Sequence, residues 1–173
     1  MWTFIWTGDG LTTVRCGHGE RMKDLEPLRK MIENGEEEII RRLMVYAIDR
    51  DYSKYTSTLE EAWRVSIAGL SNAITGAIAE YSDIPELSPD EDYRKDPIAA
   101  FGILEAQRHR QRGIPLDMFP GLLKYYRQTY IDIILDAGFE SESTAHFRLF
   151  VERCFDRIEI GSYKMEFYQK EVE

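Results

Sequence analysis

The stretch Arg108–Ile134, RHRQRGIPLDMFPGLLKYYRQTYIDII, contains the features that decide the predicted fold. It begins with the basic end of a predicted helix, which carries His109. Gly113 follows four residues after this histidine. A glycine after a helix is typical of a C-cap, while Pro115 and Asp117 are typical of the start of the next helix, with Asp117 as its N-cap. The stretch therefore predicts a helical hairpin whose second helix carries an aromatic stripe.

The chain on both sides of this hairpin also has helical periodicity from Met22 onward. Apolar residues recur three and four positions apart, which is typical of helices that bury one face. The segment 82–97 interrupts the pattern with three prolines and six acidic residues, which predicts a loop or, equally, a lid over a pocket. The predicted helices cover residues 23–34, 36–50, about 58–81, 98–112, 117–137 and 141 onward.

The first twenty residues differ from the rest, because aromatic residues alternate with other residues and glycines follow. This segment lacks the basic start and the long apolar run of a signal peptide. It could be a short strand, a poorly ordered leader, or sequence upstream of a start at Met22. We predict a poorly ordered leader over residues 1–21, one domain over residues 22–162, and an extension of the last helix over residues 163–173.

The composition limits the classes of function. With 173 residues and 43% hydrophobic residues, the chain is large enough for one domain with its own core. The net charge of −9 disfavours nucleic-acid binding, which needs clustered cations. No apolar run approaches the ~18 residues of a membrane span. Cys16 and Cys154 form no disulfide framework or metal-binding pattern, so we expect reduced thiols and a cytoplasmic location.

The last predicted helix carries apolar or small residues at alternating steps of three and four, which is the spacing of a heptad seam. Such a seam, continued to the end of the chain, predicts pairing with a partner helix in a homodimer or transmission to a following domain. The seam positions are Val151, Cys154, Ile158, Gly161, Met165, Tyr168 and Val172.

Common motifs of enzymes do not occur in the sequence: it contains no P-loop, GxGxxG, HExxH, GxSxG or CxxC pattern. We therefore predict no catalytic residues and no metal site. His109 is the one histidine in a specific setting, because it shares a helix face with the small residues Gly102 and Ala106. Those residues would leave room for a macrocycle with the imidazole as an iron ligand. The alternative is a partly exposed histidine without a ligand.

Three aromatic side chains are the predicted ligand-pocket residues: Trp63, Tyr126 and Tyr130. Tyrosines supply polar groups for a small apolar ligand, although simple core packing also explains them. Arg64 and Arg127 are cations in otherwise apolar helices, and either is a possible partner of a buried carboxylate or an acidic ligand.

Several blocks of the sequence resemble known families. EAQRHRQRGIPLDMF resembles the region around the haem-ligating histidine of globin-coupled sensors and protoglobins. The blocks YSKYTSTLEEAWRVSIAGLS, RGIPLDMFPGLLKYYRQTYIDIILDAG and FRLFVERCFDRIEIG look closer to the N-terminal input domains of bacterial sensor histidine kinases. The chain is also similar to the N-terminal domains of RsbR-type stressosome proteins, which keep a globin-like fold without haem. Together these motifs cover about residues 36–162.

The resemblance implies an all-α, globin-like bundle of about six helices with a long C-terminal signalling helix. It implies a sensory input domain, dimeric, that passes a rearrangement caused by a ligand or a partner to an output domain. The sequence has no phospho-accepting histidine motif and no ATP-binding glycine boxes, so no kinase activity is expected of this chain. Two alternatives remain: a haem-binding gas or redox sensor that uses His109, and a protein-interaction module without a ligand.

Overall fold

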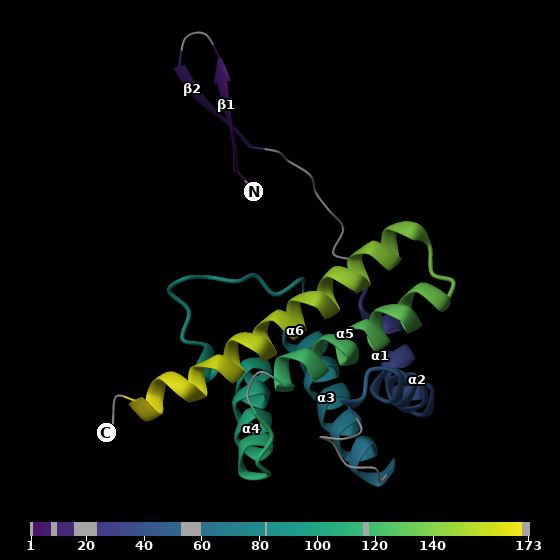
Figure 1. Ribbon diagram of the computed structural model, residues 1–173. Coiled ribbons are helices and arrows are strands. Elements are labelled where there is room, and N and C mark those ends of the chain that lie inside the picture. Colours follow the sequence, from purple (N-terminus) through teal and green to yellow (C-terminus); the bar gives the residue numbers. More distant parts are fainter. Residues whose placement is uncertain are drawn as a thin grey trace.

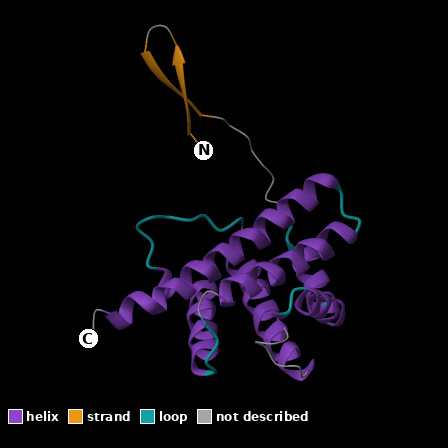
Figure 2. Ribbon diagram, viewed as in Figure 1, coloured by secondary structure: helices purple, strands orange, loops and turns teal. Residues whose placement is uncertain are grey.

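The computed structural model describes the backbone of residues 2–7, 10–15, 24–52, 60–81, 83–115 and 118–170, and side chains in most of these ranges from residue 24 to residue 163. Residues 24–170 form an all-α bundle in the part of the chain that the structure describes (Figures 1 and 2). Its helices are α1 (Glu26–Asn34), α2 (Glu36–Asp49), α3 (Glu60–Glu80), α4 (Pro97–Gln111), α5 (Met118–Asp136) and α6 (Ser141–Lys170), with a short 3-10 helix, η2 (Tyr93–Lys95), before α4.

The N-terminal segment contains two strands within the described residues. Strand β1 (Trp2–Thr7) pairs antiparallel with strand β2 (Gly10–Arg15), and Thr7 lies opposite Gly10 in the register. A strand was one of the alternatives that the sequence left open for residues 1–21. The division of the chain into a leader, one domain over residues 22–162 and an extension over residues 163–173 stays a prediction.

Local signals in the sequence account for the helix ends. The Asp96 carboxylate accepts hydrogen bonds from the amides of Ile98 and Ala99, both at 3.2 Å, and so caps the first turn of α4. The predicted C-caps at Gly113 and Gly138 are confirmed, with φ of +75° and +71°. This left-handed conformation is readily accessible to glycine. The predicted N-cap of α5, Asp117, lies outside the described residues.

The helices pack around one apolar core to which every α-helix contributes. Helices α5 and α6 run antiparallel, and α3 and α4 lie across them (Figure 1). Helix α4 touches α6 backbone to backbone: a Cβ built on Gly102 would lie 2.0 Å from the Ile158 carbonyl oxygen, and one on Gly161 would lie 2.0 Å from that of Ala99. Only glycine permits this approach, so the backbones of α4 and α6 are in direct contact at these two positions.

The first four positions of the C-terminal seam pack inside their own domain. Val151, Cys154 and Ile158 have no exposed surface, and Gly161 is buried, all within the domain itself. These four positions therefore pack on the core of their own chain and are not available to a second copy. The side chains of the remaining seam positions, residues 165, 168 and 172, lie outside the described part.

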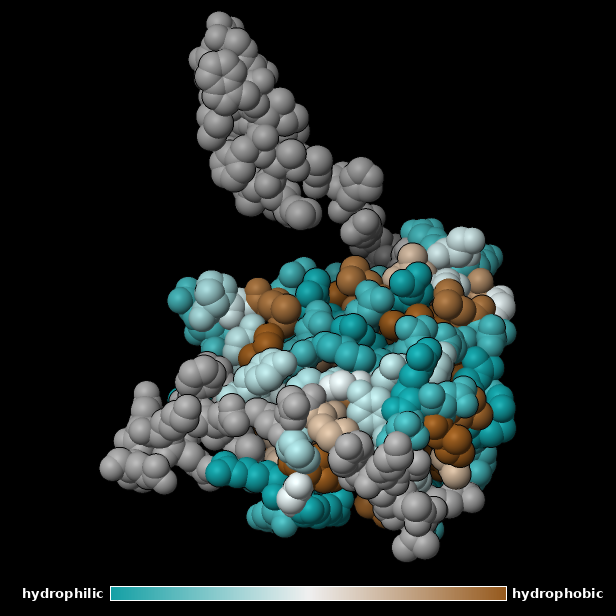
Figure 3. Space-filling view, in the orientation of Figure 1, coloured by the Kyte–Doolittle hydropathy of each residue, from teal (hydrophilic) through white to brown (hydrophobic). Residues whose placement is uncertain are grey.

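The surface of the bundle is mostly hydrophilic, with separate hydrophobic groups on the face shown in Figure 3. None of the helices that the structure describes is both long and apolar enough to cross a membrane. The large apolar side chains with the most exposure are Val45, Ile48, Val65, Leu87, Leu104, Leu135, Leu149 and Tyr163.

Candidate ligand pocket

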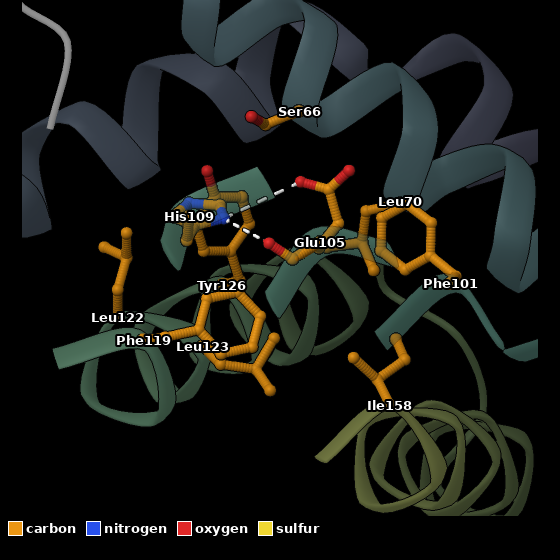
Figure 4. A pocket seen from close by; sticks show the side chains of 10 residues that line it. All are labelled: Ser66, Leu70, Phe101, Glu105, His109, Phe119, Leu122, Leu123, Tyr126 and Ile158. Atoms are coloured by element: carbon orange, nitrogen blue, oxygen red, sulfur yellow. Dashed lines mark hydrogen bonds and ion pairs between the residues drawn. The ribbon is translucent and has the colours of Figure 1, made fainter. Parts of the chain in front are cut away.

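A pocket lies where four helices meet, and its wall is mainly apolar (Figure 4). Helices α3, α4 and α5 form most of the wall, and α6 contributes a single side chain, Ile158. The polar side chains of the wall come from α3, α4 and α5. The lining residues are Ser66, Leu70, Phe101, Glu105, His109, Phe119, Leu122, Leu123, Tyr126 and Ile158.

The pocket is small, with a cavity volume of about 30 Å³. Since one water molecule needs about 10–15 Å³ measured this way, the space has room for roughly two. A larger ligand requires the lining side chains to move. Most of the apolar side chains that line the pocket belong to α4 and α5, among them Phe101, Leu122 and Leu123. Leu70 on α3 and Ile158 on α6 complete the apolar wall. The described arrangement is therefore a partly open pocket with little free volume.

His109, which the sequence singled out as a possible haem ligand, lines the pocket, and its ring is held in a defined orientation. Its Nδ1 lies 2.8 Å from the backbone carbonyl oxygen of Glu105, one turn earlier on α4. A carbonyl oxygen only accepts, so Nδ1 donates this hydrogen bond, and Nε2 is the acceptor in the neutral form of the ring. The ring also packs on Phe119, with the two centroids 4.9 Å apart. The surroundings thus fix both the tautomer and the position of the imidazole.

Glu105 places a carboxylate at the same end of the pocket. Its Oε2 lies 3.9 Å from His109 Nδ1, and its Oε1 accepts from Arg108 Nη1 at 2.6 Å. The Glu105 side chain is only 12% exposed, whereas that of Arg108 is 50% exposed. The guanidinium therefore balances the carboxylate from the solvent side, and this end of the pocket carries little net charge.

Tyr126 and Trp63 lie together, as expected of ligand-pocket residues, but only Tyr126 lines the cavity. The two rings stack with centroids 6.2 Å apart and planes at 29°. Burial raises the pKa of the Tyr126 phenol above its usual range, and its hydroxyl forms a side-chain hydrogen bond with Ser66. The phenol is therefore neutral at physiological pH. Trp63 stacks on the Tyr126 ring without lining the cavity itself.

The third predicted pocket residue, Tyr130, is not among the residues that line the cavity. Its hydroxyl pairs with Ser71 Oγ at 2.7 Å, and its ring meets Phe155 edge-on at 5.8 Å. Burial raises the pKa of this phenol as well. Tyr130 is thus a core residue whose one polar atom is satisfied inside the bundle, which matches the packing alternative.

The haem interpretation of His109 does not fit the described arrangement. Gly102 and Ala106, the small residues that were expected to make room for a macrocycle, are buried. A Cβ on Gly102 would collide with the backbone of α6 at Ile158, so this face of α4 is filled by another helix. A cavity of about 30 Å³ beside His109 is far too small for haem.

Two arginines that the sequence singled out pair with carboxylates near the surface. Arg64 Nη1 lies 2.5 Å from Glu37 Oε1, and Arg127 Nη1 lies 3.6 Å from Asp156 Oδ1. The arginine that is buried is Arg157 of α6, with 3% of its surface exposed. Sequence reasoning missed it, because its carboxylate partners lie more than sixty residues away along the chain.

Within the described residues, no group of three or more His, Cys, Asp or Glu side chains is arranged to hold a metal ion. Comparison of the chain with protein-family models, with curated proteins and with solved structures finds no match in any of the three.

Proposed function

We propose that this chain is a globin-like sensory input domain of a cytoplasmic bacterial signal-transduction protein of the histidine-kinase type. It would pass a helix rearrangement caused by a ligand or partner to an output domain. The all-α architecture and the order of the resembling blocks support the assignment. The sequence lacks kinase elements, so we place any catalytic step outside this chain.

The observation that carries the proposal is the position of the pocket between α3, α4, α5 and α6. Ile158, its contribution from α6, belongs to a helix of 30 residues that continues through Lys170. A ligand that prefers a wider separation of α5 and α6 would shift the population of helix arrangements. The far end of α6 would then report this shift to whatever follows or contacts it.

The lining favours a small, largely apolar ligand that carries one polar group. Apolar side chains would cover most of such a molecule, which is typical of ligand sites in proteins. At one end, His109 Nε2 offers an acceptor, and Tyr126 and Ser66 offer hydroxyl groups. Because Arg108 pairs with Glu105 Oε1, this end of the pocket carries little net charge and does not exclude an anionic group.

A homodimer remains part of the proposal, but we place its interface outside the first four positions of the seam. Since the described seam residues are buried in their own domain, a second copy would contact α6 beyond residue 162 or another exposed helix face. Light scattering of the full chain at high concentration tests this part; a monomer at all concentrations contradicts it.

Ligand binding can be tested with 1-anilinonaphthalene-8-sulfonate, a dye whose fluorescence rises in apolar sites, and with Leu122→Trp, which fills the pocket. We expect the wild-type chain to bind the dye and Leu122→Trp to weaken binding at least about tenfold, equivalent to 1.4 kcal/mol. Leu135→Trp is the matched control, because Leu135 lies on the same helix but is 51% exposed. Equal dye binding by all three proteins would refute the pocket as the site.

A further inference from the structure

Arg157 is a buried cation that connects three parts of the bundle. Its Nη1 lies 3.0 Å from Asp96 Oδ2 and 2.6 Å from Glu91 Oε1, while its Nη2 lies 3.0 Å from Glu91 Oε2. Nη2 also donates to the backbone carbonyl of Glu86. Bidentate pairing of this kind is the strongest form of guanidinium–carboxylate contact and fixes the geometry of both groups.

The carboxylate of Asp96 links this arginine to two other helices. It caps the first turn of α4, and its Oδ1 accepts from the Tyr81 hydroxyl at 3.0 Å, just after the end of α3. The side chains of Arg157 and Asp96 are 4% and 2% exposed. The ion pair is therefore shielded from solvent, and α3, α4 and α6 are all tied to one point.

The segment 83–96, which we call the strap, covers this point. It crosses from α3 to α4 as the long loop drawn in teal in Figure 2. Its Glu91 and Glu86 contact the guanidinium, and its Tyr93 ring lies 5.5 Å from the guanidinium carbon. On the other side, the Tyr81 ring lies 5.4 Å from the same atom. Two aromatic faces therefore flank the cation, an arrangement that adds cation–π attraction.

Because a loop of this composition has little apolar surface of its own, its attachment depends on a few contacts. Tyr93 is buried and its hydroxyl bonds both the amide and the carbonyl of Ser88, at 3.1 Å each. Among the other apolar residues of the strap, Pro85 is buried and Ile84 is half-buried. The hydrogen bonds described between the strap and α6 converge on Arg157, so this residue is a main point of attachment of the strap.

We propose that Arg157 is a latch that fastens the strap and sets the position of α6 relative to α4, two walls of the ligand pocket. Arg157 directly precedes Ile158, which lines the pocket, and Asp96 caps the helix that carries Glu105 and His109. Opening of the latch frees the strap and allows these two walls to separate. The functional part of this inference rests on the proposed sensory function; the latch itself does not.

Hydrogen–deuterium exchange of the full chain, with no ligand added, tests the latch. In Arg157→Met we expect amides of the strap and of Ile98 and Ala99 to exchange at least about tenfold faster, since hydrogen bonds to charged groups are lost. Helices α1 and α2 keep their wild-type rates. In the milder Glu91→Gln, the strap exchanges faster while Ile98 and Ala99 stay protected, because the pair between Arg157 and Asp96 persists.

Arg127→Met is the matched control, because it removes the partly exposed pair with Asp156, the residue next to Arg157 on α6, and leaves the strap contacts intact. It should leave strap exchange unchanged. The latch is overturned if the strap of the wild-type chain is unprotected, if Glu91→Gln leaves strap exchange unchanged, or if Arg157→Met accelerates every helix equally.

The coupling to the pocket has its own readout. If the latch holds the pocket walls together, Glu91→Gln binds 1-anilinonaphthalene-8-sulfonate severalfold more tightly than the wild type does, and adding Leu122→Trp removes this gain. Faster strap exchange with unchanged dye affinity would refute the coupling while leaving the latch intact. Failure of the wild type to bind the dye would instead refute the proposed function.

Discussion

Arg157 of α6 and Asp96 at the N-terminus of α4 form an ion pair in which both side chains are almost completely buried, with Nη1 3.0 Å from Oδ2. A buried pair contributes less than its Coulomb energy suggests, because both ions lose hydration. Removal of one partner is nevertheless costly, since the other charge stays buried. The intact pair therefore adds little net free energy of folding, but arrangements of α4 and α6 that separate the two charges are strongly disfavoured.

Arg157→Met should lower the free energy of unfolding by about 3–5 kcal/mol, because it leaves the Asp96 carboxylate without its cation. Urea denaturation measures the change. The control Arg127→Met should cost less than about 1 kcal/mol, since that pair is partly exposed on both sides. Similar losses in the two variants would show that the buried pair is not special.

The glycine contacts between α4 and α6 give a second test. Gly102→Ala and Gly161→Ala should each lower stability by about 1–3 kcal/mol or more, because a Cβ would lie 2.0 Å from a carbonyl oxygen of the other helix. Gly76→Ala on α3 meets no atom within 4 Å and should raise stability by about 0.5–1 kcal/mol. Denaturation midpoints distinguish the two cases; a gain in all three variants would contradict the close helix contact.

Haem supplied to the purified chain should give no Soret band that depends on His109. The reason is spatial, because the small residues on the histidine face of α4 are covered by α6 and the cavity holds about 30 Å³. Absorption spectra of the wild type and of His109→Ala should coincide after haem addition. A Soret band in the wild type that the variant lacks would reverse this conclusion.

Alkaline pH should destabilise the fold through its tyrosines. Burial and the nearby Asp96 carboxylate raise the pKa of Tyr81 to about 12, from an ordinary value of 10.0. The folded state therefore holds this proton more tightly, so the stabilisation is complete below pH 10 and is lost as pH rises from 10 to 12. Unfolding free energies measured between pH 8 and pH 11 should fall less steeply in Tyr81→Phe. Equal slopes would contradict the shift.

Helix positions could be predicted from the sequence because the signals that set them are local. The apolar spacing of Trp63, Ile67 and Ile74 identifies the buried face of α3, and all three are buried. Gly113 and Gly138 end helices with positive φ as expected. Each of these signals involves residues within one or two turns, so no knowledge of the tertiary structure was needed.

Tertiary partners were predicted less well, for a physical reason. A heptad spacing states that one helix face is apolar but not which surface covers it, and the positions of Cys154 and Ile158 are covered by their own bundle. In the same way, the small residues beside His109 were interpreted as room for a macrocycle, whereas at Gly102 the space is taken by the backbone of α6. Of the residues that the sequence singled out, His109 and Tyr126 line the pocket, whereas Trp63 and Tyr130 do not; that any of them binds a ligand stays a prediction.

The most direct test of the central claim, that pocket occupancy alters α6, is a methyl NMR titration with 1-anilinonaphthalene-8-sulfonate. We expect the Ile158 methyl signal and those of Leu122 and Leu123 to shift together with other methyl groups of α6. In Leu122→Trp, which lacks the Leu122 methyl groups, the shifts of Ile158 and Leu123 should disappear. Shifts confined to exposed side chains such as Val45 and Ile48, with Ile158 unchanged at saturation, would contradict the account.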